Sequence, residues 1–364
     1  MKQLDKSKYL LEQFTLQKAG FKPLSKLITE AFLHDEAAKK EGASIRFTEE
    51  TFNVIFGAPS INNNLFVRVK SQKSREIVGF MGMIPKTLKI QEKHYQFVIP
   101  AWLSVHPEHQ KKGLARAMGK KIFQLALEEQ FDGGYALHES DQHGYDVSRS
   151  VAKELNVTLE RIMQMNHFII RVFDSHALNK VVKLKWYESL FFKTKERIPK
   201  TAKENIRAYN KTDFPEIYDL FQQLGEKNEV AVIQQEKDIE WLLDNPQVLC
   251  FVHLDTENNI NGCVFAWEFL LAGFGKTVPF GWLDCVHIGN LTKNEGFQLV
   301  NHLCQTAYQK GWKGLQTPYI PYFPAKPLKK ANFVFFPKTM SLDIFNLTNI
   351  RLPQNAQKAY FDWR

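Results

Sequence analysis

The sequence predicts an α/β protein of two similar units in tandem, each a mixed, mostly antiparallel sheet flanked by helices. Two observations predict this class: helix and strand patterns alternate along the 364 residues, and three kinds of segment recur in the same order in both halves. A chain of this length also exceeds the usual size of one domain. We therefore expect a first domain at residues 1–174, a connecting segment at 175–204 and a second domain at 205–364.

The repeat begins with an amphipathic helix. "LQKAGFKPLSKLITEAF" near the start and "AYNKTDFPEIYDLFQQL" from about residue 208 both space apolar side chains by three and four, which predicts one apolar helical face. Hairpin patterns follow, "LFVRVKSQKSREIVGFMGMIP" and "CFVHLDTENNINGCVFAWEF", with Gly79 or Gly262 near the start of the second strand. "WLSVH" then matches "WLDCVH", each before a helix. The shared order predicts one α/β unit used twice.

The central strand of the first unit is expected at about residues 97 to 105. Apolar and polar residues do not alternate there, so both faces are predicted to be buried, and Pro100 predicts a bulge because it lacks a backbone donor. The segment "TLERIMQMNHFIIRVF" is expected to close the unit as a pair of strands. The other expected elements are strands near 65–70, 76–84 and 134–139 and helices near 113–130 and 145–156.

Charge and composition exclude several classes of protein. The net charge is +9, but the basic residues are scattered, so we expect no nucleic-acid partner. No apolar stretch approaches a membrane span and no signal peptide is evident, which predicts a cytoplasmic protein without a membrane partner. The chain has four cysteines, Cys250, Cys263, Cys285 and Cys304. No two of them are closely spaced and no cluster of histidines accompanies them, so we expect buried, reduced thiols and no bound metal.

One stretch carries more chemistry than the rest, "VHPEHQKKGLARAMGKKIF" at residues 105–123. Pro107 stops the strand, a basic loop follows, and an apolar stripe predicts a helix. The amides of a first helical turn are unpaired and the helix dipole is positive there, so a phosphate is the natural ligand. A charged, solvent-facing helix start is the alternative. The stripe consists of Leu114, Met118, Ile122 and Leu125.

The segment "LSVHPEHQKKGLA" is similar to the coenzyme A signature of the GNAT acyltransferase superfamily, with Gln110, Gly113 and Ala115 at the signature positions. The resemblance implies two GNAT-like acyl-CoA N-acyltransferase units, of which the first binds acetyl-CoA or another acyl-CoA as cosubstrate. Main-chain amides would hold the pyrophosphate, and strand-like pairing would hold the pantetheine arm. The residues so implied are Trp102, Leu103, Ser104, Val105, Gln110, Lys111, Lys112, Gly113, Leu114, Ala115 and Arg116.

The tandem layout resembles that of eukaryotic N-myristoyltransferases over most of residues 64–140 and more faintly in the second unit. Strands similar to "FVRVKSQKSREIVGFMGMIP" and "AWLSVH" carry the resemblance, with a helix running into "FDGGYAL". Two departures are a less basic loop and the lack of that family's long N-terminal arm. We therefore expect transfer of an acetyl or other short acyl group to a primary amine by direct attack. Long-chain acyl transfer and non-catalytic CoA binding are the alternatives.

An amine arrives protonated at neutral pH, so some group must accept its proton. The Glu and Tyr that many superfamily members use fall on Ile99 and Ala152 here. Substitutes lie in "YALHESDQHGY": Glu139 or Asp141 as base and Tyr145 as acid. His138 and His143 are available for proton relay, and an ordinary polar loop is the alternative.

The chain's own carboxylate at Arg364 is a second candidate base, because the terminal carboxylate has that role in the myristoyltransferases that the layout resembles. Docking of the aromatic tail without catalysis is the alternative. In the second unit, "HIGNLTKNEGF" lacks the signature, so no CoA is expected there. The segment "GWKGLQTPYIPYFP", with Trp267, Glu268, Trp282 and Asp284, is expected to wall a site for an amine-bearing small molecule or peptide, or else to be packing.

Overall fold

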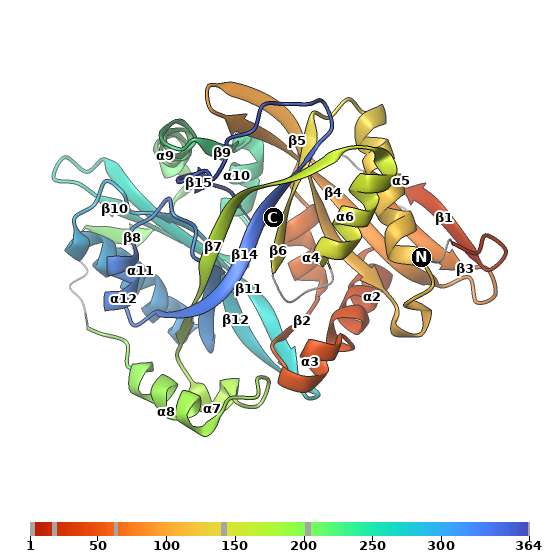
Figure 1. The fold of residues 1–364 in the computed structure, drawn as a ribbon. Coiled ribbons are helices and arrows are strands. Elements are labelled where there is room, and N and C mark those ends of the chain that lie inside the picture. The colour runs from red at the N-terminus through yellow and green to blue at the C-terminus, as the bar shows by residue number, and fades with distance from the viewer. Residues whose placement is uncertain (1–3, 17–19, 62–64, 140–143, 201–204, 363–364) are drawn as a thin grey trace. The chain divides into compact units, whose positions relative to one another are not determined.

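The computed structural model describes residues 4–16, 20–61, 65–139, 144–200 and 205–362. The chain forms two compact units, each assembled from separate stretches of sequence (Figure 1). The domain boundaries expected at residues 174 and 205 stay a prediction, and the compact units exchange segments across them. The first unit comprises Met1–Asp35, Phe47–Met165 and Lys338–Ala356, and the second comprises Glu36–Arg46, Asn166–Pro337 and Gln357–Arg364.

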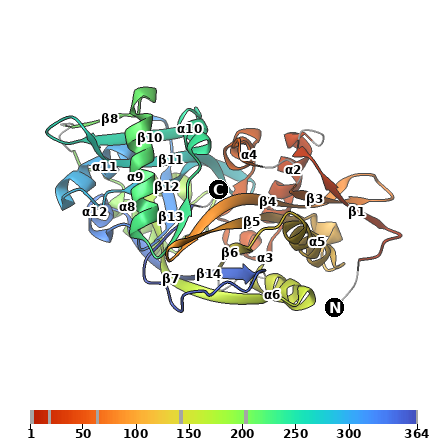
Figure 2. The ribbon, with the colours of Figure 1, turned by 90° about the horizontal axis from the view of Figure 1, so that it is seen from above.

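The sheet of the first unit has the strand order β1-β3-β4-β5-β6-β14. Strands β5 and β6 are parallel and the other neighbours are antiparallel. Figure 2 shows α2 and α4 on one side of this sheet and α5 and α6 on the other. The elements are β1 (Tyr9–Phe14), α2 (Phe21–Leu33), α4 (Glu49–Phe56), β3 (Phe66–Ser71), β4 (Ile77–Ile90), β5 (Lys93–Val105), α5 (Leu114–Glu128), β6 (Gly133–Glu139), α6 (Gly144–Leu155) and parts of β7 (Thr158–Val172) and β14 (Val334–Asn346).

The sheet of the second unit has the order β7-β13-β12-β11-β10-β8, with β12 and β13 parallel. Strand β2 pairs with β11, and β15 pairs with β9. Besides parts of β7 and β14, the elements are α3 (Glu36–Glu41), β2 (Ser44–Arg46), α7 (Ser175–Leu178), α8 (Trp186–Lys195), β8 (Ile206–Ala208), α9 (Phe214–Lys227), β9 (Val230–Ile233), α10 (Glu236–Leu243), β10 (Val248–Leu254), β11 (Ile260–Gly273), β12 (Lys276–His287), α11 (Lys293–Gln309), β13 (Gly314–Pro318), α12 (Ala325–Lys330) and β15 (Ala359–Tyr360).

The repeat expected from the sequence is present. In the first unit three antiparallel strands, β3, β4 and β5, lead through α5 to the parallel strand β6. In the second, β10, β11 and β12 lead through α11 to the parallel strand β13. The predicted mixed α/β class is therefore confirmed, and both copies place the start of a long helix directly after a central strand.

The expected closing pair of strands at "TLERIMQMNHFIIRVF" is wrong, because this segment is the single long strand β7. It contains no glycine or proline that would favour a turn, so the chain continues straight. In the first unit the place beside β6 is taken by β14, where Leu342 lies opposite Leu137. In the second unit β7 pairs with β13, where Ile170 lies opposite Gln316.

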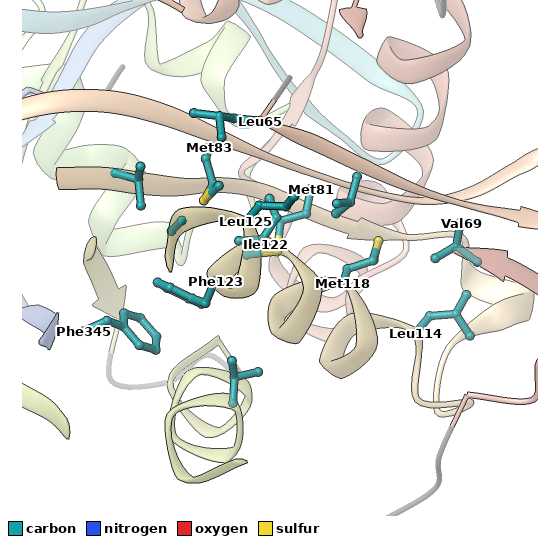
Figure 3. Packing of buried hydrophobic residues seen from close by; sticks show 14 of the residues in the cluster. Leu65, Val69, Met81, Met83, Leu114, Met118, Ile122, Phe123, Leu125 and Phe345 are labelled. Atoms are coloured by element: carbon teal, nitrogen blue, oxygen red, sulfur yellow. The ribbon is translucent and has the colours of Figure 1, made fainter. Parts of the chain in front are cut away.

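Helix α5 packs the predicted apolar stripe against β3 and β4 (Figure 3). Leu114, Met118, Ile122 and Leu125 are each at most 3% exposed. A Cβ on Gly79 would lie 3.0 Å from the Met118 Cε atom, so the helix lies close to the strand at this glycine. This packing holds the first turn of α5 at the end of β5.

The opposite face of β3, β4 and β5 carries a layer of aromatic side chains under α2 and α4. Phe66 and Phe80 stack with their ring centroids 6.2 Å apart. Trp102 of β5 joins the layer, with ring centroids 4.5 Å from Phe47 and 5.7 Å from Phe32. This layer makes the environment of the central strand strongly apolar.

The four cysteines are free and buried, as expected. Burial raises the pKa of Cys304 to about 12, so this thiol stays protonated. Within the described residues, no helix is long and apolar enough to cross a membrane.

Candidate functional site

The central strand β5 carries a bulge next to β4. Phe80 lies opposite Ser104 and Gly82 opposite Ala101, so Trp102 and Leu103 together face one residue of β4. Trp102 has a φ of 57°, in the left-handed region that non-glycine residues rarely adopt. The bulge lies two residues beyond Pro100, which stays in register opposite Met83. The sequence therefore predicted a bulge in the right strand, but not at the right residue.

Strands β5 and β6 separate soon after they meet. Their parallel pairing joins Phe97 to Gly133 and Val98 to Gly134, and the described residues show no further pair between them. The apolar side chains that follow on β5 are half-buried, although the strand lies in the middle of a sheet. An unpaired strand edge beside half-exposed apolar side chains can receive an extended, partly apolar ligand. The half-buried residues are Ile99, Pro100, Ala101, Trp102 and Leu103.

The first turn of α5 lies at the end of this strand. Gly113 precedes the helix with a φ of 83° and caps it without a side-chain hydrogen bond, and the first turn has no acidic residue. Among the described residues, none accepts a hydrogen bond from the main-chain amides of Lys111 to Ala115. Several free amides at the positive end of a helix dipole form an anion site, and a phosphate group fits it.

The basic side chains contribute less to this site than their number suggests. Arg116 is paired with Glu154 of α6, and Lys112 donates from Nζ to the Glu108 carbonyl oxygen at 2.6 Å. Lys111 is exposed. The start of α5 therefore offers a ligand main-chain amides more than side-chain charge.

The other residues predicted to bind CoA also have side chains engaged within the protein, so they would contact a ligand through main-chain groups. Leu114 is buried in the core, and the Ser104 hydroxyl donates to the Trp102 carbonyl oxygen at 2.9 Å. Gln110 Nε2 lies 3.4 Å from the Val105 carbonyl oxygen, so its side chain spans the loop. The structure thus brings the predicted loop residues together around the start of α5.

The equivalent place in the second unit is filled by the protein itself. Thr292 caps α11 and Glu295 accepts from the Thr292 amide at 2.8 Å, so a carboxylate lies at that helix start. The Val286 amide on β12 donates to the buried Tyr322 hydroxyl at 3.1 Å. These contacts place a carboxylate at the helix start and a hydroxyl on the strand amide, an arrangement that would repel a phosphate and block a strand-like ligand.

His287, beside Val286, gives a test of this packed region. Burial lowers the pKa of His287 from about 6.5 to about 4. The neutral ring therefore contributes its full share to the free energy of unfolding above pH 6.5, and this contribution is lost as the pH falls toward 4. From pH 7 to pH 5 we expect the free energy of unfolding to fall by about 2 kcal/mol more in the wild type than in His287→Gln, measured by urea unfolding.

The control for this test is Val286→Ala, at an equally buried position. It should lower stability by the same amount at both pH values, because it removes packing and no titratable group. The same pH dependence in His287→Gln and the wild type would contradict the assignment to His287.

Polar side chains from β6, α6 and β14 form a hydrogen-bonded cluster in the first unit. His138 Nδ1 lies 2.8 Å from Asp343 Oδ2, and His138 Nε2 lies 2.9 Å from Ser148 Oγ. Ser341 donates to the same Asp343 oxygen at 2.5 Å, and Arg161 Nε donates to the other at 3.2 Å. Because an ionised carboxylate only accepts, Nδ1 carries the proton and Nε2 accepts from the Ser148 hydroxyl.

Electrostatics support this assignment. Burial opposes ionisation of Asp343, but hydrogen bonds from His138 and Ser341 and the charge of Arg161 together lower the pKa of its carboxyl. The Tyr145 ring lies edge-on to the His138 ring, with centroids 5.4 Å apart. Two residues that the sequence singled out therefore meet in one cluster.

The sequence did not reveal Asp343 or Ser148. Asp343 is 205 positions from His138 and lies on a strand that the sequence assigned to the second domain. Ser148 lies four residues before Ala152 on α6, hence on the same helical face as the position where many superfamily members have a tyrosine. This spacing was the one available signal.

The other candidate bases are placed differently. Glu139 neighbours His138 on β6 and forms an ion pair with Lys338 at 2.6 Å. Asp141, His143 and Arg364 lie outside the described residues. The tail before Arg364 is docked in the second unit, where the Tyr360 and Phe361 side chains are buried.

The segment expected to wall an acceptor site is largely packed within the second unit. Trp312 is buried and donates from Nε1 to Glu268 Oε2 at 2.6 Å, and Trp267 stacks on Trp282. Gln316 lines a cavity of about 230 Å³ in this unit. The cavity is also lined by Glu41, Ala43, Ile170, Leu178, Val182, Lys183, Leu184, Glu188, Phe192, Leu271, Phe280 and Phe336.

Three features together are typical of the GNAT-type acyltransferase fold. The central strands β5 and β6 separate, a helix start with free amides lies beside them, and one α/β unit is used twice. The solved structures agree: a GCN5-related N-acetyltransferase from Kribbella flavida superposes with a TM-score of 0.50 at 11% identity, covering 93% of this chain and 71% of that chain. The fold is therefore that of the GNAT-type N-acyltransferases.

Within this class the chain resembles the N-myristoyltransferases, as the sequence predicted. Residues 5–136 match the family model "Myristoyl-CoA:protein N-myristoyltransferase, N-terminal domain". A structure of Saccharomyces cerevisiae N-myristoyltransferase with bound myristoyl-CoA superposes with a TM-score of 0.74 at 16% identity, covering 95% of this chain and 80% of that chain. A second structure of the yeast enzyme gives 0.75 at 16%, covering 95% and 84%. No curated protein matches the chain in sequence.

Proposed function

We propose that this protein transfers a long-chain acyl group from coenzyme A to a primary amine at a peptide N-terminus, by direct attack. One observation carries the proposal: a helix start with free amides adjoins a half-exposed apolar strand edge in the first unit, whereas the second unit has a carboxylate at the helix start and a hydroxyl on the strand amide. The sequence favoured a short acyl group, whereas the matching family model favours a long one. In the predicted domain division, the first domain binds CoA and the second shapes the acceptor site.

Main-chain groups of the first unit hold the cosubstrate in this proposal. The amides of Lys111 to Arg116 bind the pyrophosphate at the start of α5. Leu103 and Val105 pair with the pantetheine arm as a neighbouring strand would, along the edge that β6 leaves free. An amide at the bulge, from Trp102 or Leu103, polarises the thioester carbonyl and stabilises the oxyanion.

The apolar environment of β5 supports a long acyl chain. The β5 residues 99–103 are half-buried and apolar, and the Trp102 ring packs in the aromatic layer against Phe47 and Phe32. An acetyl group would cover little of this surface, whereas a chain of many methylenes gains free energy from each one that it buries.

Proton transfer is assigned to His138. The ionised Asp343 holds the ring with its proton on Nδ1, so Nε2 is the basic nitrogen. The Ser148 hydroxyl on Nε2 relays the proton of the attacking amine to the ring. Tyr145, beside the ring, is the proposed acid for the departing thiolate. Glu139, Asp141 and the carboxylate of Arg364 remain the alternative bases.

A series of acyl-CoA ligands tests the chain length by calorimetry. We expect the affinity to rise from acetyl-CoA through octanoyl-CoA to myristoyl-CoA, by up to about fourfold for each methylene that the site buries. Peptides with free and with blocked N-termini then test turnover, and only the free amines should be acylated. Equal affinity for acetyl-CoA and myristoyl-CoA would exclude the long-chain proposal and restore the short-chain one.

A further inference from the structure

Helix α8 of the second unit exposes an unusual number of large apolar side chains. It lies beside α7 at the margin of that unit (Figure 1). Four of the eight exposed large hydrophobic residues of the described chain lie on this helix. Exposed apolar groups that gather in one place mark a surface that contacts something other than water. The four are Trp186, Tyr187, Leu190 and Phe191, at 79%, 48%, 58% and 45% exposure.

These four residues share one face of the helix, because positions one, four and five residues apart lie within a half-turn of each other. The opposite face holds the helix on the unit. There Phe192 is buried, and its ring centroid lies 5.6 Å from that of Phe336. A surface helix normally has one apolar face, which packs on the core, whereas α8 has a second apolar face toward the solvent.

Both ends of α8 are fixed. At its C-terminal end the buried Arg171 guanidinium donates to the carbonyl oxygens of Lys195 at 2.6 Å and Glu196 at 3.1 Å. At its N-terminal end Glu188 accepts from the Lys185 amide at 2.8 Å. The exposed aromatic face is therefore presented by an anchored helix and not by a fraying segment.

The segment around α8 is strongly basic. Residues 180–200 contain seven basic and two acidic residues. Both acidic side chains accept main-chain amides, Glu188 from Lys185 and Glu196 from Ser175. None of the seven basic side chains forms an ion pair with a described residue. The seven are Lys180, Lys183, Lys185, Lys193, Lys195, Arg197 and Lys200.

We propose that α8 docks this protein on the surface of an anionic lipid bilayer, with Trp186, Tyr187, Leu190 and Phe191 inserted among the headgroups. Aromatic rings with polar edges favour that depth, and lysines that flank them attract anionic lipids. Lys185 and Lys195 already lie near the Tyr187 and Phe191 rings, so their charges border the apolar face. The sequence predicted no membrane partner because it contains no span, and an interfacial helix needs none.

Vesicle flotation without acyl-CoA tests the proposal. We expect the wild type to float with vesicles of phosphatidylcholine and phosphatidylserine, and to bind pure phosphatidylcholine vesicles at least about tenfold less tightly. The double variant Trp186→Glu, Leu190→Glu should lose at least about tenfold of the binding to the anionic vesicles. Raising the salt concentration should weaken wild-type binding, because the headgroup attraction is screened.

The matched control is Tyr308→Glu, an exposed aromatic residue of α11 in the same unit at 54% exposure. It adds a negative charge outside α8 and should float like the wild type. Failure of the wild type to bind anionic vesicles would overturn the proposal and leave a protein partner as the occupant of this face. Binding that survives in the double variant would also overturn it. Acyl-CoA affinity should be unchanged in all variants, so the acyltransferase proposal is tested separately.

Discussion

Gly113→Glu is expected to lower the affinity for coenzyme A by roughly a hundredfold or more, about 3 kcal/mol, measured by calorimetry. The change places a carboxylate at the cap of α5, where the pyrophosphate is proposed to bind, and like charges in contact repel strongly. It also replaces a glycine whose φ of 83° a side chain tolerates poorly. Circular dichroism and thermal unfolding should show a folded protein.

Two controls separate charge from backbone strain. Gly113→Ala introduces the strain without the charge and should reduce CoA affinity far less than Gly113→Glu. Gly289→Glu places the same charge in the corresponding loop of the second unit, where a Cβ meets no atom within 4 Å, and should leave CoA affinity unchanged. A folded Gly113→Glu protein that binds CoA as the wild type does would remove the proposed cradle.

His138→Gln is expected to lower kcat by about a hundredfold or more while the affinity for acyl-CoA stays the same. The substitution removes the ring that is proposed to receive the amine proton, and it keeps a side chain able to hydrogen-bond near Asp343 and Ser148.

Glu139→Gln is the control for the neighbouring position. Glu139 lies on the same strand and is paired with Lys338, and its substitution should change kcat by less than about tenfold. Asp343→Asn should lower kcat as His138→Gln does, because it removes the charge that holds the imidazole. If Glu139→Gln impaired turnover and His138→Gln did not, the base would be Glu139.

The CoA loop was the part of the candidate site that local sequence pattern described best. A glycine at a helix start, a periodic apolar stripe and a strand directly before them lie within about thirty contiguous residues. The structure added that Arg116 is paired with Glu154 and that Lys112 folds back on the loop. Such contacts depend on α6 and on loop geometry, which the pattern does not encode.

The hydrogen-bonded cluster around His138 was predicted from the sequence only in part. His138 and Tyr145 were identified because they lie close together in one polar segment after a predicted strand. Asp343 was missed because β14 returns to the first unit from the far end of the chain. Only the tertiary structure shows that the buried imidazole has a carboxylate partner.

By itself the sequence determined the repeated α/β unit, the stripe that buries α5 and the contrast between the two loops, since each depends on residues close together in the chain. The tertiary structure decided which strand completes each sheet: β14 beside β6 and β7 beside β13. It also decided that the second unit fills its own strand edge with Tyr322. These outcomes depend on hydrogen bonds between backbone groups that are distant in the sequence. Backbone groups are the same in every residue, so the sequence pattern does not indicate which strands will pair.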